Sequence, residues 1–174
     1  AIGAPTRPYV LTAVTVTGAL SVAFAAGVWR AAAGQRLLQA IAVLLFLNAA
    51  VNLALTPFGS MHQREVLAAG GGTFSDTLHL ATAGLNVFTF FAVMLAGAAA
   101  LGGRFRIYSL VTVALLLVFG GITSLSAADV ASNDPTPWLG ITERVSAYGW
   151  MAWVAVLALV LIRRASNHNE DTRA

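Results

Sequence analysis

The sequence contains no cysteine and no lysine. The absence of cysteine excludes disulfide bonds, thiolate metal sites, covalent haem attachment and cysteine nucleophiles. The absence of lysine removes the residue that a phosphate-binding loop needs beside its glycines, so the glycine run at 70–72 is not such a loop. All ten basic residues are arginines.

Charge is also scarce. Only 10% of the residues are charged and 58% are hydrophobic, whereas a soluble domain has about 25% charged residues. Such a chain would expose apolar patches over much of its surface in water. The composition therefore predicts an integral membrane protein, with the lipid bilayer as its main partner. The arginines flank apolar segments and form no basic patch, so we expect no nucleic-acid partner.

Long apolar runs are abundant instead. Five segments have the roughly 20 apolar residues that a membrane-spanning helix needs, and they cover residues 9–29, 37–56, 77–101, 107–128 and 145–162. No acidic or basic residue lies in the middle of these segments, and His79 is the one ionisable side chain inside them. We predict an all-α polytopic transmembrane helix bundle, a single domain over residues 1–164, followed by a polar cytoplasmic tail over 165–174.

The arginines are distributed unequally between the two sides of the predicted bundle. Three fall on one side, and seven fall on the side of the short turns and the C-terminus: Arg30, Arg36, Arg104, Arg106, Arg163, Arg164 and Arg173. The positive-inside rule then predicts a cytoplasmic C-terminus, with the two long loops and Ala1 outside. An outward Ala1 without a signal peptide leads us to expect one further helix upstream, six in all.

Most of the remaining polar residues lie in or beside the two long loops. Asp76 and His79 are three residues apart, so the carboxylate can orient the imidazole as a base or a metal ligand. With His62, Glu65 or Glu143 added, the ligands would suffice for zinc. The alternative, which we favour, is that Asp76 caps the third span and His79 is a hydrogen-bonded interfacial histidine. A tetrapyrrole metal bound by His79 is a weaker hypothesis.

Two further groups have competing interpretations. Glu143 and Arg144 are either an acid favoured by a helix N-terminus beside a snorkelling arginine, or ion-pair partners of Arg64 or Asp76 that tie the two loops together. Asn48 and Asn52 are four residues apart and share a helix face. With Asn86 on the next span, we interpret them as interhelical hydrogen-bonding residues rather than as a substrate path.

The polar motifs resemble those of a known family. The runs PFGSMHQREVLAAGGG, SDTLH, RFRIYSLVT and PTPWLGITERV are similar to those of the bacterial membrane proteins called DUF998, a domain of unknown function. The resemblance covers nearly the whole chain and implies a bacterial six-helix membrane protein. Together with the arginine distribution, this predicts a protein of the bacterial inner membrane with its long loops periplasmic or extracellular. On matching positions it singles out a signature set: His62, Arg64, Asp76, His79, Glu143 and Arg144. It implies no activity.

Three functions remain in competition. The one we favour is a non-catalytic accessory or binding subunit of a larger membrane complex. The alternative is a membrane-embedded lipid hydrolase or transferase in which His79 is the base or zinc ligand, with Asp76 and Glu143 as further catalytic residues and Arg64 or Arg144 as a headgroup clamp. A transporter ranks last, because the middle of each span is apolar and uninterrupted.

Overall fold

The computed structural model describes the backbone of residues 1–171 and the side chains of residues 1–167. Its helices are α1 (Arg7–Ala31), α2 (Arg36–Leu55), α3 (Arg64–Ala68), α4 (Phe74–Leu101), α5 (Gly103–Leu125), α6 (Ala127–Ala131) and α7 (Leu139–Asp171). Five helical stretches are long and apolar enough to cross a membrane, and residues 1–171 contain no strand. The prediction of an all-α polytopic helix bundle is confirmed.

The helix bounds differ most from the prediction in α7. It begins at Leu139, six residues before the predicted start at 145, because Pro135 and Pro137 end the preceding loop and a helix can start directly after them. Glu143 and Arg144 consequently lie in its second turn. The helix also runs past 162 to Asp171, so residues 165–171 of the predicted tail are helical. Arg173, counted in the arginine asymmetry, lies outside the described residues.

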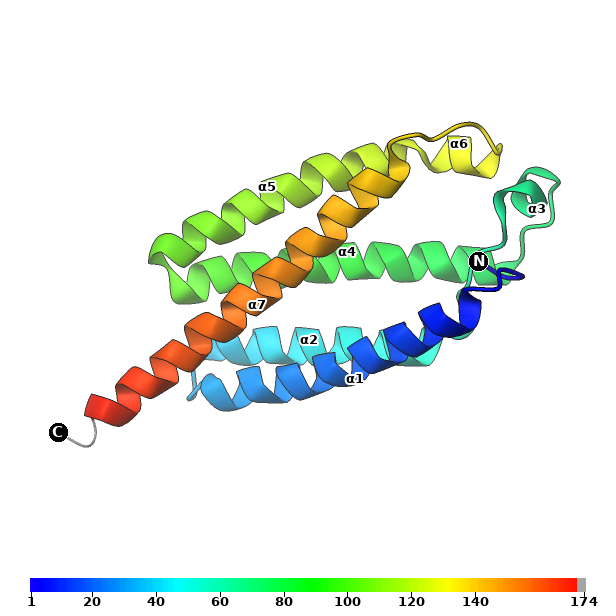
Figure 1. Ribbon diagram of the computed structural model, residues 1–174. Helices are drawn as coiled ribbons and strands as arrows, with labels where there is room; N and C mark the ends of the chain where they lie inside the picture. Colours follow the sequence, from blue (N-terminus) through cyan, green and yellow to red (C-terminus); the bar gives the residue numbers. More distant parts are fainter. Residues whose placement is uncertain (172–174) are drawn as a thin grey trace.

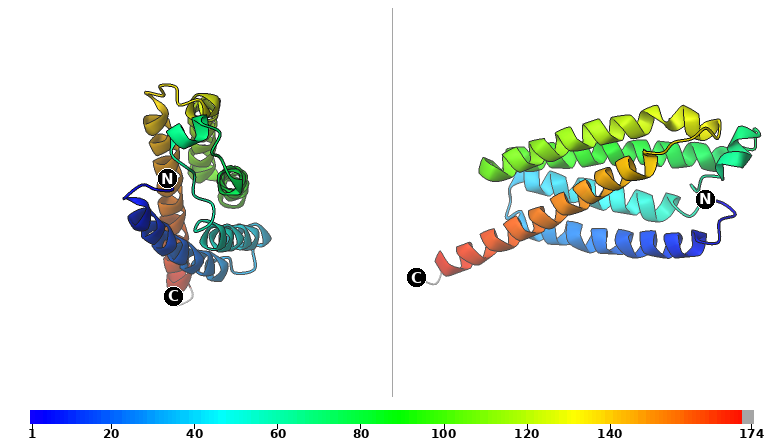
Figure 2. Two further views of the ribbon diagram at one scale, coloured as in Figure 1. Left: turned by 90° about the vertical axis from the view of Figure 1, so that its right-hand side faces the viewer. Right: turned by 45° about the horizontal axis from the view of Figure 1, so that its top comes forward.

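The long helices pack mostly in chain order. α1 packs on α2, α2 on α4, α4 on α5 and α5 on α7. α7 crosses the bundle diagonally and makes smaller contacts with α1 and α4 (Figure 1). The views in Figure 2 show the N-terminus beside α3 at one end and the C-terminus emerging at the other. The long connections between helices therefore lie at one end of the bundle and the short turns at the other.

We name the two ends by their residues. The polar cap is formed by residues 1–6, 56–73 and 126–138, which include the short helices α3 and α6. The arginine end contains both short turns and the C-terminal part of α7, and its described arginines are Arg30, Arg36, Arg104, Arg106, Arg163 and Arg164. Arg7, Arg64 and Arg144 lie in or beside the polar cap. Within the described residues, the structure therefore separates the arginines as the sequence predicts.

An aromatic core joins α4, α5 and α7. The Trp153 side chain is fully buried, and its indole Nε1 donates a hydrogen bond of 2.9 Å to Ser109 Oγ. Its ring lies 5.7 Å from that of Trp150 and 5.6 Å from that of Phe105. Gly97 lets this ring approach α4, because a Cβ added there would lie 2.8 Å from the Trp153 ring. Packing of this kind holds helices together in lipid, where apolar burial alone does not.

Candidate functional site

The start of α4 is fixed by Asp76. Thr73 precedes the helix in an extended conformation, and its hydroxyl accepts a hydrogen bond of 3.3 Å from the Ser75 amide. The Asp76 carboxylate in turn accepts from the Thr73 amide, with Oδ2 2.7 Å from the nitrogen. Together these bonds form a capping box, which satisfies helix-end amides that have no intrahelical partner. The interpretation of Asp76 as a helix cap is confirmed.

The same carboxylate binds His62, which lies in the connection between α2 and α3. Asp76 Oδ1 accepts from the His62 amide at 2.8 Å, and Oδ2 lies 2.9 Å from His62 Nδ1. The two side chains are only 18% and 11% exposed. An ionised carboxylate only accepts hydrogen bonds, so Nδ1 carries the proton in this pair and Nε2 is left as the other ring nitrogen. Asp76 thus orients His62 rather than His79, contrary to the pairing considered from the sequence.

Two further side chains of α4 hold the same loop. His79 Nδ1 lies 2.9 Å from the Gly59 carbonyl oxygen. The Ser75 hydroxyl lies 2.6 Å from the Phe58 oxygen and 2.7 Å from the Ser60 oxygen. A hydroxyl has one proton, which these two carbonyls share. The first turns of α4 therefore clamp the backbone of residues 58–62, and His79 takes part as the hydrogen-bonded histidine that we favoured.

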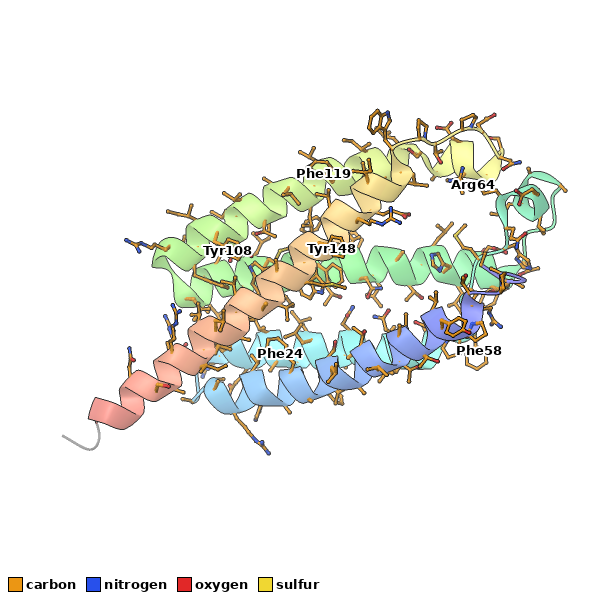
Figure 3. All side chains as sticks on the ribbon, viewed as in Figure 1. Phe24, Phe58, Arg64, Tyr108, Phe119 and Tyr148 are labelled. Atoms are coloured by element: carbon orange, nitrogen blue, oxygen red, sulfur yellow. The ribbon has the colours of Figure 1, made fainter. Side chains whose placement is uncertain are left out.

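Arg64 connects the two halves of the polar cap. It is the first residue of α3, and its side chain extends toward the loop that follows α6 (Figure 3). Its guanidinium donates to Thr136 Oγ1 at 2.6 Å and to the Asp134 carbonyl oxygen at 3.3 Å. At the other edge of the cap, the Ile2 amide donates to the Met61 oxygen at 2.7 Å. All three segments of the polar cap are therefore linked, directly or through α4, into one body.

Glu65, Glu143 and Arg144 do not join this network through an ion pair. Arg144 Nη1 donates to the Gly140 oxygen of its own helix at 2.8 Å, and both glutamates are exposed. Within the described side chains, no arginine forms an ion pair, and the His62–Asp76 contact is the one close contact between a basic and an acidic side chain. The hypothesis that Glu143 and Arg144 tie the loops together by ion pairs is therefore wrong. Arg64 makes that connection instead, through a hydroxyl and a carbonyl on the other loop.

The structure does not bring the proposed zinc ligands together. Zinc needs three or four side chains converging at about 2.0–2.3 Å. Across the part of the chain that the structure describes, no group of three histidine, cysteine, aspartate or glutamate residues could hold a metal ion. His79 uses Nδ1 on a backbone carbonyl, while Asp76 is occupied by His62 and Thr73. In the structure, His62, Asp76 and His79 instead hold the loop between α2 and α4 through hydrogen bonds.

The three asparagines meet between α2 and α4. Asn86 Oδ1 accepts from Asn48 Nδ2 at 2.6 Å and from Asn52 Nδ2 at 2.7 Å. Asn86 Nδ2 returns a hydrogen bond of 3.1 Å to Asn52 Oδ1. Each amide thus has a partner on the facing helix, as polar groups in a bilayer require. The interpretation of the asparagines as interhelical hydrogen-bonding residues is confirmed.

Asn86→Ala is expected to lower the free energy of unfolding by about 1–2 kcal/mol, because it removes three hydrogen bonds between α2 and α4. The measurement is detergent-induced unfolding followed by circular dichroism. Thr89→Ala on the same helix is the control, since its hydroxyl binds only the Leu85 oxygen of its own helix. Equal losses for the two variants would contradict an interhelical role for Asn86.

Comparison with known proteins gives a family but no activity. The family model described as "Protein of unknown function (DUF998)" matches residues 1–160. This range includes all the long helices except the end of α7, together with every residue of the polar cap. No curated protein and no solved structure matches the chain.

Proposed function

We propose that this chain, which belongs to the DUF998 family of proteins of unknown function, is a non-catalytic accessory subunit of a larger membrane complex and docks other membrane subunits through its polar cap. The observation that carries the proposal is that the polar side chains at the start of α4 and in the loop before α3 hold the backbone of the polar cap. Asp76, His62, His79 and Ser75 all bind the loop or the helix start. These hydrogen bonds hold the loop backbone in place and so give the polar cap a rigid surface on which a partner can dock.

The surface of the polar cap supports docking. Phe58 and Trp138 lie in its two long connections and are 71% and 69% exposed. Exposed aromatic side chains held on a rigid backbone are typical of binding sites, since little freedom is lost when a partner covers them. Arg64 fixes one connection to the other, so the two aromatic side chains are held on one body.

The arginine asymmetry supports an orientation for this subunit. Six described arginines lie at the arginine end, against three in or beside the polar cap. By the positive-inside rule, we propose that the arginine end is cytoplasmic and that the polar cap faces the periplasm or exterior of a bacterial cell. The partners would then meet the cap outside the cytoplasm.

Arg64→Ala tests the docking proposal. We expect it to lower the fraction of chain that migrates in a high-mass assembly on native gels severalfold, because the two loops lose their connection. Arg144→Ala is the matched control at the same end, since Arg144 binds only its own helix. A chain that leaves native membranes as a monomer, or an Arg64→Ala variant that assembles like the wild type, would overturn the proposal.

One observation favours a second candidate, a lipid hydrolase. The contact of 2.9 Å between Asp76 Oδ2 and His62 Nδ1 is the arrangement by which a carboxylate orients a histidine as a general base. In that case His62, rather than His79, would activate a water molecule. Purified wild type and His62→Gln should be compared for release of fatty acid from phospholipid vesicles. The accessory role predicts that neither protein releases fatty acid. Release by the wild type that is lost in His62→Gln would establish the hydrolase.

A further inference from the structure

A narrow groove runs along the outside of the bundle between α1 and α2, next to the arginine end. Its volume is about 320 Å³, and its walls are almost entirely apolar. Val22, Ala26 and Trp29 of α1 form one side, and Val43 and Phe46 of α2 form the other. Arg30 is the one charged residue that lines it. The groove is thus an open apolar surface groove with one positively charged side chain, that of Arg30.

Measured along the helices, the groove is nearly as long as one lipid leaflet is thick. Arg30 is the second-last residue of α1, and Val22 lies eight residues earlier. Eight residues of α-helix rise about 12 Å, and half of a bilayer's hydrocarbon thickness is about 15 Å. Trp29, which is 51% exposed, occupies the interfacial level at which tryptophan is enriched. The apolar walls therefore extend as far as one acyl chain does, with Arg30 at the level of the headgroups.

The charge at this end suits an anion. Five of the seven acidic residues lie in or beside the polar cap at the opposite end of the bundle, and the other two, Glu170 and Asp171, are at the end of α7. Two arginines of the arginine end donate to nearby carbonyls, Arg106 to Ala98 and Arg164 to Leu101. For Arg30, which is exposed, the described part of the structure contains no hydrogen bond or ion pair. Its guanidinium is free to bind a phosphate, the group whose geometry it matches best.

We propose that the groove between α1 and α2 is a binding site for an anionic phospholipid, with one acyl chain in the groove and the headgroup phosphate on Arg30. The inference does not depend on the docking function of the polar cap. A second groove at the same end provides a contrast within the molecule. It lies between α1 and α7, has about 370 Å³ and is lined by alanine, glycine, valine, leucine, isoleucine and phenylalanine without any arginine. We expect this groove to show no preference for anionic lipid, because no charged residue lines it.

Native mass spectrometry of the full chain tests the proposal, after incubation with phosphatidylglycerol or phosphatidylcholine carrying the same acyl chains. The wild type is expected to retain phosphatidylglycerol preferentially. Arg30→Gln should weaken this retention about fivefold, the effect of one arginine on an anionic lipid. Arg104→Gln, which removes an exposed arginine of the same end away from the groove, should have a smaller effect. Equal losses in the two variants would show general attraction by the arginine end and overturn the site.

A second pair of variants tests the acyl chain. Ala26→Leu fills the groove without changing its charge and should reduce phosphatidylglycerol retention. Ala23→Leu makes the same change on the same helix in the contrasting groove and should not. Glycerol phosphate, which has the headgroup without the chains, should not displace the lipid. The proposal is overturned if wild type holds both lipids equally, if Ala26→Leu has no effect, or if glycerol phosphate competes, which would indicate a site for free phosphate.

Discussion

Asp76→Ala is expected to lower the melting temperature in detergent by several degrees, the largest effect of any substitution among the residues that hold the polar cap in place. Four donors lose their acceptor at once: the amides of Thr73 and His62, Nδ1 of His62 and the hydroxyl of Thr73. The two amide hydrogen bonds are partly buried, and an amide that loses its acceptor there is only partly compensated by water. The capping box at the start of α4 is removed by the same change.

Hydrogen exchange distinguishes this local effect from general damage. In Asp76→Ala the amides of His62 and Thr73 should lose protection, while the middle of α4 keeps it. Asp134→Ala is the matched control, since its side chain is exposed and only its backbone oxygen binds Arg64. If Asp76→Ala melts like Asp134→Ala and both amides remain protected, the carboxylate does not brace the loop. The general-base arrangement with His62 would then be the better explanation of its position.

The sequence predicts the long helices well, because each needs only local information. A run of about 20 apolar residues specifies a span whatever surrounds it. The cap at Asp76 is also local, since it lies three residues after Thr73. The predicted bounds of α7 are less accurate. The apolar run marks only the part of the helix that lies in lipid, and backbone hydrogen bonds can continue the helix into polar residues on either side. It started after Pro137 and continued into polar residues as far as Asp171.

The contacts of the candidate site depend on distant segments. His62 and Asp76 are 14 residues apart across a connection with a short helix, and Arg64 and Thr136 are 72 apart. Helical spacing relates Asp76 to His79, and that relation suggested the wrong partner. No comparable rule relates a loop histidine to a helix cap. The asparagines were more predictable, because two polar side chains on one helix face in lipid require partners on a facing helix.

Trp153→Ala is expected to lower the free energy of unfolding by about 3–5 kcal/mol, the usual cost of removing a fully buried aromatic side chain. The variant leaves a cavity between α4, α5 and α7, and the surrounding helices cannot close it without moving Gly97 and Phe105. The fully buried Ser109 hydroxyl also loses its donor. Detergent-induced unfolding, followed by circular dichroism, measures the loss.

Two variants separate ring packing from the hydrogen bond and from the mere loss of a tryptophan. Trp153→Phe keeps an aromatic ring in the core but removes the indole donor, so it should lose about 1 kcal/mol for the hydrogen bond together with a smaller packing loss than alanine causes. Trp138→Ala removes the same residue type from an exposed position and should change stability by less than about 0.5 kcal/mol. Because apolar surface gains nothing by moving from lipid into the bundle, a large loss in Trp153→Ala must come from contacts between helices. If Trp153→Ala lowers the free energy of unfolding no more than Trp138→Ala does, the aromatic core does not hold α7 on α4 and α5. The polar contacts between helices would then be the main source of the bundle's stability.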